Sequence, residues 1–158
     1  MTNETRMPVR IARTGMVASA NPIASAIGVE TLRAGGNAVD AAITMGFAMA
    51  VLQPNLSHFG GDLFLQYYDP NTRTAHALNG SGAAPSGATR EAMGDEIPER
   101  GIRAAAVPGA VHGWLTALEQ WGTWTPAAAL APAIALAEEG FAHVADAGAQ
   151  GQRGGRGA

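Results

Sequence analysis

The turn at 79–82, Asn-Gly-Ser-Gly, brings together groups that suit the binding of a carboxylate or an amide. It offers a side-chain amide, a hydroxyl and two flexible backbone N–H groups directly after a predicted strand. Ser81 has no base nearby in the sequence and does not lie in a G-x-S-x-G elbow, which argues against a nucleophilic role. We therefore interpret Asn79 and Ser81 as candidate substrate-binding residues. A plain turn is the alternative, because Asn, Gly and Ser all favour turns.

The other titratable and glycine-rich positions show no pattern that is typical of a metal or phosphate site. The four histidines form neither H-x-x-x-H nor H-E-x-x-H. The glycines at 35–36 and 80–82 complete no G-x-G-x-x-G, and no G-K-[ST] follows them. We therefore predict no metal and no cofactor. His58 lies in a predicted loop beside two glycines, where it is either a substrate contact or an idle surface residue.

The first elements that must position these residues are a strand and a helix. Residues 16–20 are apolar and predict a strand that ends at Asn21-Pro22, a pair typical of a helix start. The helix begins at Ile23 and ends at the glycine pair 35–36, since glycine adopts the left-handed conformation that closes helices.

A second, strongly apolar helix follows at once. Asn37 is its predicted N-cap, with Asp40 in the capping-box position. Gln53-Pro54 ends it. Its continuous apolar face consists of Val39, Ile43, Phe47 and Val51. The opposite face of the helix holds alanine, glycine and methionine, so we expect this helix to be buried nearly all round.

The middle of the chain predicts a β-hairpin and a long loop. Residues 63–68 and 74–78 are rich in strand-forming residues and flank a turn. Residues 79–101 are rich in glycine, proline and charge, which indicates a loop with at most a short helical turn at 90–93. A short strand is predicted at 102–107.

Two further helices complete the pattern. Apolar residues from Val111 to Trp121 recur at helical spacing. Thr125 caps the last helix with Pro126 in its first turn, and Gly140 ends it.

Composition limits the class of protein. The 158 residues correspond to about one domain. With 47% hydrophobic and 15% charged residues, the chain is typical of a globular protein that has little polar surface, so we expect an incomplete unit. A net charge of −3 and the lack of lysine argue against nucleic-acid binding.

The sequence also limits its surroundings. Without cysteine there is no disulfide framework and no thiolate nucleophile. The first ten residues lack the pattern of a signal peptide, so the cytoplasm is the default compartment. The longest apolar stretch, 41–52, is interrupted and too short to cross a membrane.

Five motifs lie in order between about residues 15 and 141. The run Leu-Arg-Ala-Gly-Gly-Asn-Ala-Val-Asp-Ala-Ala at 32–42 is the most specific of them. Together they closely resemble the γ-glutamyltransferase family. The motifs occupy residues 15–22, 32–42, 60–64, 107–109 and 130–141.

The resemblance implies a fold and a mechanism. Members are N-terminal nucleophile hydrolases with a four-layer αββα sandwich, made as a precursor that cuts itself into a large and a small subunit. The amino-terminal threonine of the small subunit attacks a γ-glutamyl amide, with its own α-amine as base and backbone N–H groups around the oxyanion. This machinery would lie beyond residue 158. We therefore expect an α+β chain, an incomplete αββα sandwich, that holds no catalytic residue and is inactive alone.

The resemblance also bears on the substrate. The family's large subunit supplies an arginine, in an R-E-x-A-P motif, that pairs with the glutamyl α-carboxylate. Here residues 81–85 read Ser-Gly-Ala-Ala-Pro, so Ser81 takes the place of the arginine and Gly82 that of the glutamate. The loss of this charge implies another amide, as in members similar to oxamate amidohydrolases or cephalosporin acylases. Arg90 in the following loop is a weaker candidate for the missing charge.

The resemblance suggests three segments and two functional hypotheses. Residues 1–14 are an extension, 15–147 match the start of the large subunit, and 148–158 form a Gly/Arg-rich tail that is too poor in apolar residues to pack. The first hypothesis is a fragment of an amidohydrolase or acyltransferase that needs a small-subunit segment and a small-molecule amide, with no nucleic acid or membrane as partner. The alternative is a non-catalytic domain that binds small amides or a partner chain.

Overall fold

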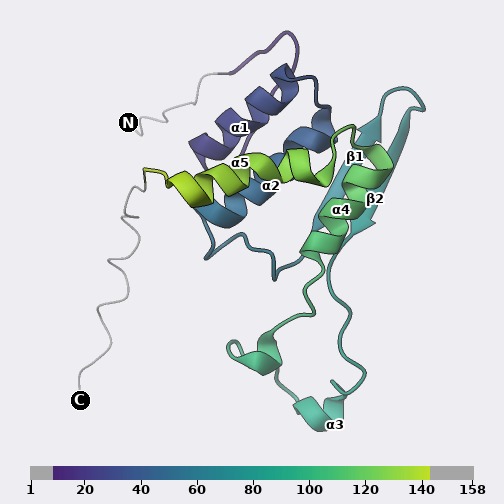
Figure 1. Ribbon diagram of the computed structural model, residues 1–158. Coiled ribbons are helices and arrows are strands. Elements are labelled where there is room, and N and C mark those ends of the chain that lie inside the picture. Colours follow the sequence, from purple (N-terminus) through teal and green to yellow (C-terminus); the bar gives the residue numbers. More distant parts are fainter. Residues whose placement is uncertain (1–8, 143–158) are drawn as a thin grey trace, which may run out of the picture.

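The computed structural model describes residues 9–142, in which four longer helices pack beside one β-hairpin (Figure 1). Helix α2 lies at the centre and contacts α1, α4 and α5, while α4 also contacts the hairpin. Residues 83–106, here called the arm, extend away from these elements (Figure 1). In chain order the elements are α1 (Pro22–Arg33), α2 (Ala38–Leu52), β1 (Phe64–Asp69), β2 (Thr74–Asn79), α3 (Arg90–Met93), the 3-10 helix η1 (Ile102–Ala104), α4 (Ala110–Trp121) and α5 (Pro126–Glu139).

The helices start where the sequence predicts, and the caps predicted at Asn37 and Thr125 are confirmed. The side chain of Asn21 accepts a hydrogen bond from the backbone N–H of Ile23 at 2.8 Å. Asn37 and Asp40 form a complete capping box at the start of α2. Thr125 accepts from a backbone N–H in the first turn of α5 at 3.2 Å. These ends are set by local side-chain chemistry, which explains why the sequence predicts them.

Glycines let the helices approach closely. A Cβ on Gly28 of α1 would lie 2.4 Å from the sulfur of Met45 in α2. A Cβ on Gly46 of α2 would lie 3.3 Å from the indole of Trp114 in α4. The same indole meets Phe47 edge-on, with ring centroids 5.0 Å apart. The main hydrophobic core thus forms where α2, α4 and α5 meet the inner face of the hairpin.

The hairpin is amphipathic. Strands β1 and β2 pair antiparallel, with Leu65 opposite Leu78 on the side that packs against the core. The other face is open, with Phe64 73% and Tyr68 57% exposed. Because alternate residues of a strand point to opposite faces, a single hairpin covered on one side leaves these aromatic rings uncovered.

Two predicted strands are wrong. Residues 16–20 form no strand; the segment crosses α1, where Val17 lies against Gly28. Residues 102–107 begin with η1 and continue without regular structure. Both stretches contain only one or two β-branched residues among alanines, which disfavour strands, and neither finds a partner for its backbone hydrogen bonds within the described residues.

The arrangement is α+β, as expected. Among residues 9–142 the sheet has two strands, and core residues of α2, α4 and α5 lie against its inner face. No helix within that range is long and apolar enough to cross a membrane. The predicted tail, 148–158, and most of the predicted extension, 1–14, lie outside the described residues.

A buried carboxylate ties α2 to the connection between α4 and α5. Asp40 is 0% exposed. It accepts from the Thr123 hydroxyl at 2.6 Å, from the Thr123 and Trp124 backbone N–H groups at 2.9 and 3.0 Å, and from Asn37 N–H at 2.8 Å. The amide of Asn37 in turn donates to the Trp121 carbonyl at 2.7 Å. A satisfied network of this kind fixes the position of α5.

This network predicts a loss of stability in acid. Burial by itself raises the pKa of Asp40, but the hydrogen bonds from Thr123, Asn37 and Trp124 outweigh it and hold the pKa below the ordinary 3.8. A carboxyl whose pKa is lower in the folded state stabilises the protein above its unfolded pKa, and this contribution is lost as pH falls through the folded pKa. The free energy of unfolding, measured by urea denaturation between about pH 5 and about pH 2, should therefore fall. Asp40→Asn should flatten this part of the profile.

Candidate functional site

The turn that the sequence singles out lies where the hairpin meets α4. Strand β2 ends at Asn79, and Gly80 extends the ladder by one pair. Its N–H donates to the Leu63 carbonyl at 2.7 Å, and the Leu63 N–H donates to the Gly80 carbonyl at 3.4 Å. The turn therefore starts from a rigid strand end, which favours a fixed geometry for the side chains that follow.

The structure brings the two predicted binding residues together. Asn79 Oδ1 accepts from the Ser81 backbone N–H at 2.9 Å and from the Ser81 hydroxyl at 2.7 Å. Asn79 is exposed and Ser81 is half-buried. This leaves the side-chain NH2 of Asn79 as a further donor and the Ser81 oxygen as an acceptor. The pair offers neutral polar groups that suit an amide.

A residue that sequence reasoning did not assign joins them. Asp62 is exposed, and its Oδ1 accepts from the Gly82 backbone N–H at 3.3 Å. It places a carboxylate beside the turn. The sequence contains Asp62 within the Gly-Gly-Asp motif at 60–62, but the residue lies 20 positions before Gly82, so only the fold reveals the contact. Asp62, Asn79, Ser81 and Gly82 are called the hairpin base below.

Backbone segments cross at the hairpin base without room for side chains. A Cβ on Gly82 would lie 1.7 Å from the Val107 carbonyl oxygen. A Cβ on Gly109 would lie 2.2 Å from the Gly80 carbonyl oxygen. Only glycine permits such an approach, and the arm leaves and returns at this crossing.

The start of α4 is held at the same point. The Gly61 carbonyl accepts from the N–H groups of Gly109 and Ala110 at 3.3 and 3.0 Å. The N-cap, Gly109, has no side chain with which to cap the helix, so the loop before β1 takes over that task. The loop before β1, the turn after β2 and the start of α4 therefore form one unit.

A shallow hollow extends from the hairpin base along the open face of the sheet. Its volume is about 540 Å³. Asn79 lies at one end of it, and Phe64 and Gln66 from β1 lie beside Ala77 from β2. Apolar side chains beside a few amide groups, here those of Gln66 and Asn79, are typical of sites for small amphipathic molecules.

The structure does not bring the other sequence candidates to the hairpin base. The guanidinium of Arg90 binds Asp95 at 2.7 and 3.1 Å within the arm. His58 is exposed in the loop after α2, with its ring over the glycine pair 60–61. No cluster of three or more metal-ligating side chains occurs in the described range, 9–142.

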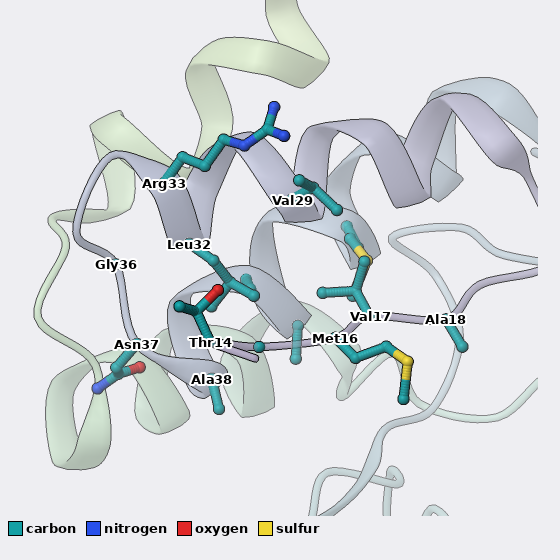
Figure 2. A pocket seen from close by; sticks show the side chains of 14 residues that line it. Thr14, Met16, Val17, Ala18, Val29, Leu32, Arg33, Gly36, Asn37 and Ala38 are labelled. Carbon is teal, nitrogen blue, oxygen red and sulfur yellow. The ribbon is translucent and has the colours of Figure 1, made fainter. Parts of the chain in front are cut away.

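A second hollow lies elsewhere, between α1, α2 and residues 14–18 (Figure 2). Its volume is about 900 Å³ and its lining is mostly apolar, with Met16, Val17 and Leu32 among its residues. Two of its polar members already have partners: Arg33 binds Glu30 at 2.6 Å, and the Asn37 side chain caps the start of α2 and donates to the Trp121 carbonyl. This groove offers little for amide chemistry, so the hairpin base is the better candidate.

Comparisons with known proteins point to one family. The family model described as Gamma-glutamyltranspeptidase matches residues 24–153. The glutathione hydrolase proenzyme of Bacillus subtilis (strain 168) is 41% identical over 141 residues, which cover 84% of this chain and 24% of the relative. The acylase ACY 1 proenzyme of Pseudomonas sp. (strain SE83) is 37% identical over 139 residues, 80% of this chain and 25% of the relative.

Solved structures agree. The γ-glutamyltranspeptidase of Helicobacter pylori superposes with a TM-score of 0.79 at 37% identity and covers 85% of this chain and 40% of that chain. The cephalosporin acylase of Bacillus halodurans gives a TM-score of 0.75 at 39% identity, over 89% of this chain and 28% of that chain. The chain spans about a quarter of the length of the curated relatives that it matches. By sequence and by structure, the chain belongs to the γ-glutamyltranspeptidase family.

Proposed function

We propose that the hairpin base is part of the acyl-donor pocket of an amidohydrolase or acyltransferase that acts on γ-glutamyl or other small amides. The observation that carries this proposal is the joined pair Asn79 and Ser81, which leaves polar groups accessible at the end of β2. The names of the relatives, glutathione hydrolase and acylase, support the reaction class. In this role the residues bind and orient the amide.

The nucleophile is proposed to lie outside residues 1–158. In the family that this chain resembles, an amino-terminal threonine of a second subunit supplies both nucleophile and base. The side chains at the hairpin base form no nucleophile–base pair, because the Ser81 hydroxyl donates to an amide oxygen, which is not a base. The chain alone would then hold a substrate without converting it.

We expect the purified chain to show no turnover of γ-glutamyl-p-nitroanilide or oxamate above buffer. The same sample, treated with an electrophilic glutamine analogue, should keep its intact mass. Release of nitroaniline or a covalent adduct would contradict the proposed absence of a nucleophile.

A hybrid enzyme tests the binding role directly. In the Bacillus subtilis proenzyme, the matching 141-residue region would be replaced by that of this chain. We expect Ser81→Arg to raise kcat/KM for γ-glutamyl-p-nitroanilide about tenfold, because a guanidinium at this place pairs with the α-carboxylate. Ser86→Arg adds the same charge within the exposed arm and should change little. Equal effects of the two substitutions would contradict a substrate contact at Ser81.

One observation favours the second hypothesis, a non-catalytic binding domain. The open hairpin face exposes two aromatic rings, which is typical of a surface that another chain covers. A cooperative melting transition and a monomeric species would support an independent domain. A molten, dye-binding state would support a fragment that needs the rest of its fold.

A further inference from the structure

We infer that Asp62 selects the charge of the ligand at the hairpin base, so that the site takes small amides that carry an ammonium group and disfavours those that carry a carboxylate. This inference rests on the proposed function, because it assumes that Asn79 and Ser81 bind the amide. It adds a specificity-determining residue and a substrate class.

A backbone hydrogen bond orients the carboxylate toward the turn. One oxygen of Asp62 accepts the Gly82 N–H at 3.3 Å, and the Gly82 backbone itself packs closely on Val107. The second oxygen of Asp62 has no hydrogen bond to residues 9–142. Asp62 therefore presents an anionic acceptor beside the backbone of Gly82, the residue that follows Ser81.

No cation of the described residues neutralises this carboxylate. The salt bridges within residues 9–142 join Arg33 to Glu30 and Arg90 to Asp95, so Asp62 takes part in neither. Arg103 binds the Ala92 carbonyl inside the arm. A ligand ammonium can therefore pair with Asp62, whereas a ligand carboxylate would meet a like charge.

The other groups at and beside the hairpin base carry no charge. Asn79 and Ser81 are neutral, and the hollow beside them is lined by Phe64 and the uncharged amide of Gln66. These groups accommodate a short carbon chain and a carboxamide without favouring either charge. The charge preference of the hairpin base therefore comes from Asp62.

Three four-carbon amides that differ in terminal charge test the inference. The probes are 4-aminobutanamide, butanamide and succinamate, each titrated into the ¹⁵N-labelled full chain while backbone amide signals are followed by NMR. We expect the NMR signals of Ser81 and Gly82 to shift. The cation 4-aminobutanamide should bind most tightly, the neutral butanamide less tightly, and the anion succinamate most weakly. An exposed ion pair predicts about a threefold tighter Kd for the cation than for the neutral amide.

Two substitutions separate charge from shape. Asp62→Asn keeps the oxygen that accepts from Gly82 and should make the cation and the neutral amide bind alike. Asp95→Asn removes a carboxylate of similar exposure within the arm and should leave the order unchanged.

Three outcomes would contradict the role proposed for Asp62. Binding of succinamate as tight as that of 4-aminobutanamide would overturn the role of Asp62 while leaving the amide site intact. No movement of the Ser81 and Gly82 signals with any probe would overturn the proposed site as well. An unchanged order in Asp62→Asn, with its spectrum otherwise preserved, would also overturn the inference.

Discussion

Gly82→Ala should destabilise the chain by about 3 kcal/mol, because the new methyl group would clash with neighbouring backbone atoms. Its Cβ would lie 1.7 Å from the Val107 carbonyl oxygen and 2.5 Å from the carbonyl carbon, and both are backbone atoms. Backbone at this point cannot yield without separating the hairpin base from α4. Urea denaturation of the purified variant measures the loss, and the NMR signals of Asn79 and Ser81 should shift with it.

Gly87→Ala is the matched control, because a Cβ on Gly87 meets nothing within 4 Å. Gly87 lies in the arm, shortly after Gly82, and the substitution makes the same chemical change, so it should leave the free energy of unfolding nearly unchanged or slightly raised. Equal stabilities of the two variants would contradict the tight crossing. A loss confined to Gly82→Ala would show that the contact between two backbone segments, and not the conformation of the arm, requires glycine.

Asp40→Ala should cost about 3 kcal/mol of the free energy of unfolding, because each buried donor left without a partner costs about 1–3 kcal/mol. The substitution leaves the backbone N–H groups of Thr123, Trp124 and Asn37 without their shared acceptor in a buried place. Thermal or urea unfolding measures the loss. We expect the backbone NMR signals of α5 to shift as strongly as those of α2, because Asp40 joins the two helices.

Asp95→Ala serves as control for the loss of a carboxylate. Asp95 is exposed and its ion pair with Arg90 lies on the arm, so its removal should change the stability by less than about 1 kcal/mol. A similar small effect at Asp40 would show that the network contributes little. An effect limited to the start of α2 would show that Asp40 acts only as a helix cap.

The sequence predicts the local elements well. Helix starts at Asn37 and Thr125 and the hairpin between β1 and β2 depend on residues close together in the chain. The strand predicted at 16–20 fails because Val17 is its single β-branched residue and no segment of the described residues pairs with it. Local preference can place an element, whereas pairing depends on distant segments.

The same limit applies to the site. Asn79 and Ser81 are two residues apart, and their contact follows from the turn that they form. Asp62 joins them only through the pairing of Leu63 with Gly80, and Asp40 reaches Thr123 across 83 positions. A capping box is readable in the sequence, but its second role as the anchor of α5 needs the packed structure.

The arm is attached to the rest of the chain in a way that allows its length to change. Each hydrogen bond made by residues 85–105 joins two residues of the arm itself, and both of its ends meet at one glycine crossing. Because closing a longer loop costs little additional entropy, insertions or deletions in the arm should be tolerated far better than in the helices. Relatives are therefore free to acquire new length, and new recognition, at this position while the framework beneath it stays constant.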